Sequence, residues 1–248
     1  MSDIMSDVYN KDDLPKEVIG ILGGFGSYAT LDFFERLLDS FPVEKEWDRP
    51  RVLIDNYCTL PSRVRGILYG EYEEEIIEGI TTSIENMMNA GATKIIISCN
   101  TAHYFLDEVY VRLPESRNVI INIIEELAMQ LSSDGVEEVS LIASEGTLVC
   151  GIYQDTFEKY GIRINAPTEE EFPKLREFIE IVKQNKEITP EVKKDFIEFI
   201  TEQKDTSVIL GCTEFPVIYK HVKEDIESEN LTIYDPLDTA ILKIKENI

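Results

Sequence analysis

The chain has 248 residues, of which 48 are Asp or Glu and 24 are Lys or Arg, so its formal net charge at pH 7 is −24. Hydrophobic residues make up 43% of the sequence, which is enough to bury the core of one large domain or two small ones. The negative charge argues against nucleic-acid binding and against binding to anionic membrane surfaces, because both need clustered Lys and Arg. No apolar run approaches the roughly 20 residues that a membrane-spanning helix needs.

The N-terminal segment, residues 1–16, is acidic and polar, and no basic stretch in it leads into an apolar one. This composition is not that of a signal peptide. We therefore expect a loosely ordered lead over 1–16, and cytoplasmic residence as the default location.

Apolar runs and helical periodicity alternate along the chain from residue 18 onward. In the N-terminal half, strands are predicted at residues 18–22, 51–54, 94–98 and 119–122, and helices at 28–38, 71–89, 101–111 and 124–131. In the C-terminal half, strands are predicted at 139–142, 162–165, 208–210 and 232–234, and helices at 148–160, 170–184, 190–203, near Pro216 and at 237–246. This alternation predicts an α/β fold of mostly parallel sheets flanked by helices.

Two of the predicted strand ends resemble each other. Residues 94–101 (KIIISCNT) and 207–214 (SVILGCTE) each form an apolar strand that ends in Cys followed closely by Thr. The echo predicts two similar half-domains that face each other across a cleft, each with one thiol at the carboxyl end of a parallel strand, where open α/β sheets build their sites. The predicted division is a first half-domain of 17–118 plus 221–248, carrying Cys99, and a second half-domain of 119–220, carrying Cys212.

The four cysteines are Cys58, Cys99, Cys150 and Cys212, and none belongs to a Cys-x-x-Cys pair. With only two histidines in the sequence, no metal site is predicted. In a reducing compartment the four side chains are expected to be free thiols. Cys150 is interpreted as a core residue, and Cys58 either packs as structural filler or lines the mouth of the cleft.

Cys99 and Cys212 both fall where a strand gives way to a helix. A helix N-terminus stabilises a thiolate and also binds a carboxylate. If the halves face each other, one thiolate can remove a proton from the α-carbon of an acid while the opposite thiol delivers a proton to the other face. Such a pair inverts a stereocentre without a pyridoxal cofactor.

Three segments carry a resemblance to a known family, namely 19–30 (IGILGGFGSYAT), 99–103 (CNTAH) and 211–214 (GCTE), with weaker support from 61–63 (PSR), 146–147 (GT) and 235–238 (DPLD). The chain resembles the cofactor-independent aspartate/glutamate racemase superfamily, in particular its aspartate racemase branch. The resemblance covers the chain from about residue 18 to its end. It implies two α/β half-domains with the site in the cleft between them, no cofactor and no metal, an acidic amino acid as substrate, and a homodimer.

The resemblance also implies residue roles. Cys99 and Cys212 match the catalytic acid/base pair of the family. Arg63 matches the arginine that meets the acidic side chain of the substrate, and a local cation is also what a dianion needs in a protein of charge −24. The further residues implied to bind substrate are Asn100, Thr101, Thr213, Gly24, Phe25, Asn56, Thr59 and Lys174.

Several positions depart from the family pattern. Phe25 stands where Met is usual, and Ser27-Tyr28 where Pro-Leu is usual. The segment 56–59 (NYCT) replaces Asn-x-Pro-Gln. Lys174 is the nearest match to a lysine that aspartate racemases place after a Pro-Thr-Glu segment, but Pro173 occupies the expected position. These departures leave the chemistry intact and the choice of substrate open.

Two other residues near the cysteines have open roles. His103 lies one helical turn beyond Cys99, where it either tunes the thiol or packs. Glu214 either orients a neighbour or favours a helix N-terminus.

Three alternatives compete with an aspartate racemase. The segment 24–29 (GFGSYA) fits a relaxed dinucleotide-binding pattern, but the best acidic match, Asp55, lies about 30 residues along instead of about 20. A glutamate racemase, a broad-specificity racemase, or another isomerase or decarboxylase of the same superfamily would keep the fold and change the reaction. A catalytically silent relative would only bind the acid, although it would not need both cysteines.

Overall fold

The computed structural model describes residues 15–246, so the predicted lead lies outside the described residues apart from its last two positions. The described chain forms two four-stranded parallel sheets. The first sheet has the order β2-β1-β3-β4, with β1 at Val18–Gly23, β2 at Arg51–Asn56, β3 at Lys94–Ile97 and β4 at Ile120–Ile121. The second has the order β6-β5-β7-β8, with β5 at Glu138–Ala143, β6 at Arg163–Asn165, β7 at Ser207–Gly211 and β8 at Thr232–Tyr234. The α/β prediction is confirmed.

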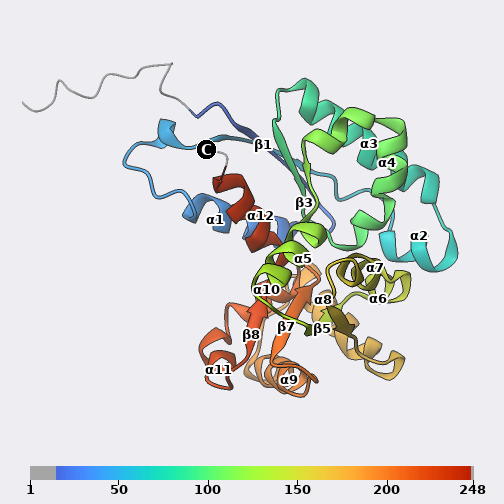
Figure 1. Ribbon diagram of the computed structural model, residues 1–248, viewed down its shortest axis with the longest axis vertical. Helices are drawn as coiled ribbons and strands as arrows, with labels where there is room; N and C mark the ends of the chain where they lie inside the picture. Colours follow the sequence, from blue (N-terminus) through green and yellow to red (C-terminus); the bar gives the residue numbers. More distant parts are fainter. Residues whose placement is uncertain (1–14, 247–248) are drawn as a thin grey trace, which may run out of the picture.

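Helices connect the strands and cover the sheets (Figure 1). Before the second sheet begins they are α1 (Ser27–Asp39), α2 (Arg63–Tyr69), α3 (Glu73–Asn89), α4 (Leu106–Arg112) and α5 (Ile123–Ser133). The later helices are α6 (Glu145–Cys150), α7 (Ile152–Glu158), α8 (Phe172–Lys183), α9 (Pro190–Thr201), α10 (Phe215–Tyr219), α11 (Lys223–Glu227) and α12 (Pro236–Lys245). Short 3₁₀ helices are η2 (Glu46–Asp48), η3 (Thr101–Phe105), η4 (Pro114–Asn118) and η5 (Glu169–Glu171).

The two sheets have the same topology. In the first, β1 pairs with β2 and β3, and β3 pairs with β4; in the second, β5 pairs with β6 and β7, and β7 pairs with β8. Strands β3 and β7 therefore occupy equivalent positions, and the predicted echo between 94–101 and 207–214 is this equivalence. Cys99 and Cys212 follow these two strands, each at the carboxyl end of its sheet.

The pairing corrects the predicted division of the chain. Strand β4, with Ile120 opposite Ile95, belongs to the first sheet, whereas the prediction began the second half-domain at residue 119. Strand β8, with Ile233 opposite Val208, belongs to the second sheet, whereas the prediction assigned 221–248 to the first half-domain. The chain thus passes between the sheets once, after β4, and its C-terminal strand stays with the second sheet.

The two halves share a hydrophobic core. One continuous cluster includes Ile21 and Ile96 of the first sheet, Leu127 of α5, and Leu141 and Ile209 of the second sheet. Helices α5 and α12 lie between the two sheets in Figure 1 and pack against each other. A second cluster lies entirely within the first half. The central strands are buried almost throughout, as expected of parallel sheets covered on both faces.

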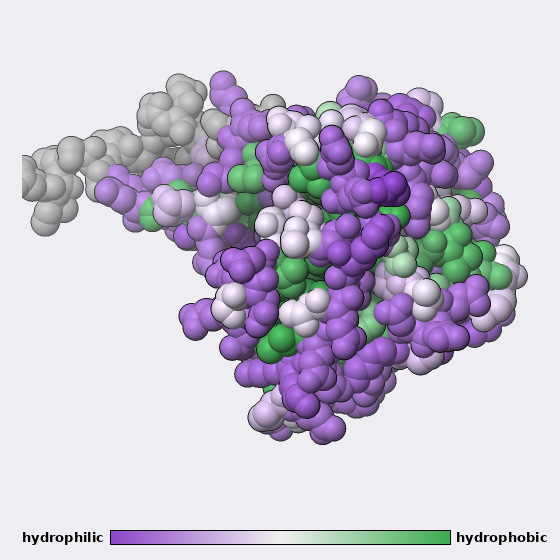
Figure 2. Space-filling view, turned by 60° about the horizontal axis from the view of Figure 1, so that its bottom comes forward, coloured by the Kyte–Doolittle hydropathy of each residue, from purple (hydrophilic) through white to green (hydrophobic). Residues whose placement is uncertain are grey.

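Some elements differ from prediction. Helices α2 and α11 were not predicted, and the helix expected at 148–160 is broken into α6 and α7 at Gly151, whose φ of +70° is readily adopted by glycine. The helix expected at 101–111 begins as the 3₁₀ helix η3 before continuing as α4. Within residues 15–246, no helix is both long and apolar enough to cross a bilayer. Hydrophilic side chains cover most of the face seen in Figure 2.

Candidate active site

A cavity of about 400 Å³ brings the carboxyl ends of the two sheets together. Both Cys99 and Cys212 line it. On one side the cavity is bounded by α2 of the first half, which packs on α6 of the second half. At this contact a Cβ added to Gly146 would lie 3.1 Å from Cα of Val64, so the glycine allows the close approach. The cavity is therefore built from both halves.

Cys99 is held in place by its own backbone. Its N–H donates to the carbonyl of Ile97 over 2.8 Å, and its carbonyl accepts a bond of 2.9 Å from Nδ1 of His103. His103 is buried, and burial lowers its pKa to about 4, so the ring is neutral with its proton on Nδ1. Of the two predicted roles for His103, the structure provides packing and a hydrogen bond to the backbone beside the thiol.

Cys212 is buried, and its Sγ donates to Oε2 of Glu214 over 3.0 Å. Burial, and next the negative charge of Glu214, raise the pKa of the Cys212 thiol well above its usual value, while Lys183 opposes them. The neighbouring Cys99 raises the same pKa further. Cys212 therefore rests as a protonated thiol aimed at a carboxylate.

The carboxylate of Glu214 lies between Lys183 and the glycine-rich turn. Its Oε1 lies 3.9 Å from Nζ of Lys183. A Cβ added to Gly26 would lie 2.2 Å from the same oxygen, so the glycine-rich turn leaves the space that this carboxylate fills. Next to it, Thr213 donates to the carbonyl of Ser98 over 3.4 Å, which ties the loop after β7 to the loop after β3. Glu214 accepts a bond from its neighbour Cys212 and is also the N-cap residue of α10, so the structure fits both of its predicted positions.

Arg63 is the first residue of α2 and is buried. Its guanidinium donates to the carbonyls of Leu60, Pro61 and Phe25 at 3.1, 2.6 and 3.4 Å, and it stacks on the Phe25 ring with 4.4 Å to the centroid. Among the residues that the structure describes, no carboxylate lies within ion-pair distance of it. Arg63 is therefore a buried cation whose charge is left for an anionic ligand.

The loop after Cys99 is also hydrogen-bonded to the second half. Oγ1 of Thr101 lies 2.9 Å from Oγ of Ser144 and 2.8 Å from Oγ1 of Thr147. Oδ1 of Asn100 accepts a bond of 2.6 Å from the hydroxyl of Tyr153, a fully buried side chain of α7. These bonds tie the loop after Cys99 to the start of α6 and to α7 in the second half.

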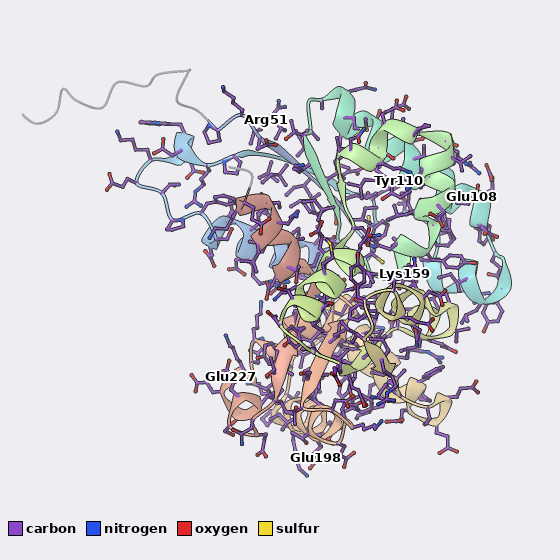
Figure 3. The ribbon with its side chains drawn as sticks, viewed as in Figure 1. Arg51, Glu108, Tyr110, Lys159, Glu198 and Glu227 are labelled. Carbon is purple, nitrogen blue, oxygen red and sulfur yellow. The ribbon has the colours of Figure 1, made fainter. Side chains whose placement is uncertain are left out.

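The charges around the cavity favour an anion. Its lining contains the cations Arg63, Arg65, Arg176 and Lys183 and the carboxylates Glu145, Glu180 and Glu214. The site therefore carries a slight positive excess in a chain of charge −24. Figure 3 shows acidic side chains such as Glu108, Glu198 and Glu227 at the periphery of the molecule, on α4, α9 and α11. The cleft is therefore a more favourable place for an anion than the acidic surface around it.

The structure brings most of the predicted site residues to the cavity and leaves four away from its lining. Those in the lining are Phe25, Arg63, Cys99, Asn100, Thr101, Cys212 and Thr213. Gly24 serves the backbone turn, since its φ is +85° and an added Cβ would lie 2.4 Å from the N of Tyr57. Asn56 donates to Ser27, and Thr59 is exposed. These three residues do not line the cavity, and their role in binding substrate stays a prediction.

Lys174 is the fourth residue away from the cavity. Its Nζ bonds to Asp195 and Glu177, on the side of α8 that faces α9. The cavity-lining residues of α8 follow a different helical stripe, which includes Phe172, Arg176 and Lys183. The structure therefore places Lys183 in the cavity, where Lys174 was predicted.

Four charged residues of the second half that line the cavity were missed from sequence, namely Glu145, Arg176, Glu180 and Lys183. Arg176 pairs with Glu145 at the start of α6. The helical spacing of Arg176 and Lys183 puts both on one face of α8, but nothing in the sequence indicates that this face meets the cavity. Within residues 15–246, no group of three or more His, Cys, Asp and Glu side chains is arranged to hold a metal ion.

Two parallel α/β halves that each contribute a thiol to one cavity are consistent with a class of enzyme that inverts a stereocentre. A family model described as Asp/Glu/Hydantoin racemase matches residues 22–244. The chain therefore belongs to this family of isomerases, and the predicted resemblance to the superfamily is confirmed. In this family context the glycines of 24–29 shape a turn and make room for Glu214, so no dinucleotide is needed to explain them.

Individual relatives cover much of the chain. The solved structure of an aspartate racemase from Picrophilus torridus matches with a TM-score of 0.76 and 26% identity, covering 92% of this chain and 93% of that one. A glutamate racemase from Lactobacillus acidophilus is 27% identical over 227 residues, 89% of this chain and 76% of that protein. A protein named glutamate racemase 3 from Caldanaerobacter subterraneus is 24% identical over 189 residues, 74% of this chain but only 66% of that protein.

Proposed function

We propose that the protein interconverts L- and D-aspartate by proton transfer between the substrate α-carbon and two thiols, those of Cys99 and Cys212. One observation carries the proposal: the two thiols follow equivalent strands of the two sheets and line the same cavity. The similarity to an aspartate racemase over nearly the whole chain supports the choice of substrate.

The binding groups suit a dicarboxylate. Arg63, which has no carboxylate partner among the described residues, would take the side-chain carboxylate of aspartate. Asn100 and Thr213, beside the two cysteines, would donate to the α-carboxylate. Lys183 would add positive charge on the Cys212 side. These donors would also stabilise the negative charge that spreads onto the α-carboxylate when the α-proton leaves.

The proton transfers balance in both directions. In one direction the Cys99 thiolate removes the α-proton and becomes a thiol, and the Cys212 thiol then protonates the opposite face of the planar carbanion and becomes a thiolate. In the other direction the two thiols exchange roles. The raised pKa of Cys212 keeps it protonated for the first direction and makes its thiolate a stronger base for the second.

A second candidate substrate is glutamate. The sequence relatives described above are named glutamate racemases, and the same thiols and the same arginine would serve a diacid longer by one methylene. One methylene changes binding in a pocket by only about 1–3 kcal/mol, so the two acids must be compared on the same protein.

The experiment is proton NMR of the purified protein in D₂O with L-aspartate, repeated with L-glutamate, and without added cofactor. Loss of the α-proton signal together with formation of the D-isomer is expected, faster with aspartate. The variants Cys99→Ser and Cys212→Ser should each lose racemisation, while Cys58→Ser, at an exposed thiol outside the lining, should keep it. Silence with both acids would overturn the proposed function, and near-normal racemisation by either single variant of the pair would overturn the two-thiol mechanism.

A further inference from the structure

Tyr153 links the two halves of the protein at the active site. It belongs to α7, in the second half, and its side chain is fully buried. Its hydroxyl donates over 2.6 Å to Oδ1 of Asn100, which follows Cys99 in the first half and lines the cavity. A phenylalanine at this position would fill nearly the same space, so packing alone does not require the hydroxyl.

The bond determines how the Asn100 amide is oriented. Within the described part of the chain, the Tyr153 hydroxyl has no other hydrogen-bond partner. Burial, followed by the charges of Asp235 and Cys212, raises the pKa of Tyr153 well above its usual value, so the hydroxyl stays protonated and keeps donating. If the Asn100 amide turned over, the buried hydroxyl proton would lose its acceptor, which is unfavourable.

The other end of the amide lacks a partner. Nδ2 of Asn100 is buried and bonds to no atom of residues 15–246. Buried N–H groups in native proteins are nearly always paired, so an orphaned one in a residue lining a cavity points to a ligand acceptor. The neighbouring Cys99 places that acceptor close to the reacting carbon of the proposed substrate.

We propose that Tyr153 is a positioning residue that holds the Asn100 amide with Oδ1 away from the ligand and Nδ2 toward it, so that Nδ2 donates to a carboxylate oxygen of the substrate. The inference deepens the proposed function and rests on it for the identity of the ligand as an amino acid. Tyr153 itself touches no reacting atom. It acts from the opposite half of the molecule and links assembly of the cleft to recognition of the carboxylate.

The test is Tyr153→Phe, which removes only the hydroxyl. KM for L-aspartate should rise about tenfold, as expected for the loss of one well-oriented hydrogen bond to a charged group, while kcat changes less than KM. Tyr160→Phe is the matched control, because that hydroxyl faces Glu125 outside the cavity, and it should leave both constants unchanged. Thermal unfolding of all variants checks that they are folded.

A double-mutant cycle separates positioning from general packing. If Tyr153 acts through Asn100, Tyr153→Phe should add nothing to Asn100→Ala. Asn100→Asp keeps the acceptor for Tyr153 but replaces Nδ2 with an oxygen, so it should weaken binding at least as much as Asn100→Ala. It tests the same geometry even if Tyr153→Phe does not fold.

Calorimetric titration with L-aspartate gives a readout that does not depend on turnover. Suppose that the wild type racemises aspartate. If Tyr153→Phe then has the KM and binding constant of the wild type, the positioning role is wrong and the function stands. The same holds if Tyr153→Phe weakens aspartate binding by the same factor in the Asn100→Ala protein as in the wild type. If the wild type binds aspartate without racemising it, the function is wrong, and the binding constants of the variants decide the inference. If the wild type does not bind aspartate, both are overturned.

Discussion

The thiol of Cys212 donates to the carboxylate of Glu214 across 3.0 Å in a buried environment. The contact pairs a candidate catalytic thiol with a carboxylate, a group that accepts hydrogen bonds and donates none. Lys183, 3.9 Å from the other carboxylate oxygen, offsets part of the negative charge, and Gly26 leaves the carboxylate room. Glu214 is therefore placed to receive the thiol proton whenever Cys212 must become a thiolate.

Glu214→Gln should lower kcat for aspartate racemisation about a hundredfold, because proton transfer by a positioned group contributes on the order of 10²–10⁴ in rate. KM should change little. The equilibrium constant between enantiomers is one, so kcat/KM must fall by the same factor from either side. Circular dichroism of the substrate measures both directions. Glu177→Gln, on the side of α8 away from the cavity, is the matched control. A variant with wild-type kcat would remove Glu214 from the mechanism.

The two thiols that line the cavity could be predicted from the sequence because their signals are local. An apolar strand that ends in Cys-Asn-Thr or Cys-Thr-Glu needs no knowledge of distant contacts, and strand ends of parallel sheets meet at one edge. The two boundary strands carried no comparable signal. Strand β4 has two residues and β8 has three, which is too short a pattern to indicate which sheet each one joins.

Lys174 and Lys183 show where sequence reasoning ends. Both lie on α8, and helical periodicity alone assigns them to different faces without indicating which face meets the cleft. That choice depends on how α8 packs against α1, α9 and α10, which is a property of the tertiary structure. Helix α2 was missed for a different reason, because its seven residues span only about two helical turns, which is too short to show a period.

The two lysines provide a matched pair of variants. Lys183→Met removes a cation from the cavity lining and should raise KM for aspartate at least tenfold, about 1.4 kcal/mol in binding. Lys174→Met removes a cation that bonds to Asp195 and Glu177 outside the cavity, and KM should not change. Initial rates over a range of substrate concentrations give both values. The reverse ranking would restore Lys174 to the site.

Arg36 of α1 bonds three carboxylates at once. It donates to Asp32 at 3.0 Å and, at the start of α12, to Asp235 at 2.7 Å and to Asp238. Asp32 and Asp235 are both buried. The cluster ties α1 of the first half to the last helix of the second half, on the far side of α1 from the cavity.

Arg36→Met should lower the free energy of unfolding at pH 7.5 by about 3 kcal/mol, since it leaves the buried carboxylate of Asp235 without its cation, whereas Asp32 keeps its bond to Lys220. Burial already raises the pKa of Asp235 to about 6, with Arg36 opposing, so losing the arginine raises that pKa further. Part of the lost stability should return at pH 5.5, where Asp235 binds a proton. Urea denaturation at both pH values measures this. Arg112→Met, at an exposed ion pair with Glu74, should cost far less.

His103 should give the folded protein a pH dependence of known sign. Burial lowers its pKa to about 4 in the native state, whereas a histidine in the unfolded chain titrates near 6.5. Between these values the unfolded state binds more protons, so the free energy of unfolding falls as the pH falls. The stability that the neutral ring contributes is present above about pH 6.5, and about 2 kcal/mol of it should be lost by pH 5.

The check is a comparison of urea unfolding at pH 7.5 and pH 5.0 for the wild type and His103→Gln. Acidic residues contribute to the slope in both proteins, so the difference between the two slopes isolates the histidine. The variant should lose about 2 kcal/mol less than the wild type over this interval. His221→Gln, at an exposed ring whose pKa is lowered mainly by partial burial, should remove a smaller part of the slope. Equal slopes for His103→Gln and the wild type would mean that His103 is protonated in the folded state near pH 5, and its bond to the Cys99 carbonyl would then have to hold a charged ring.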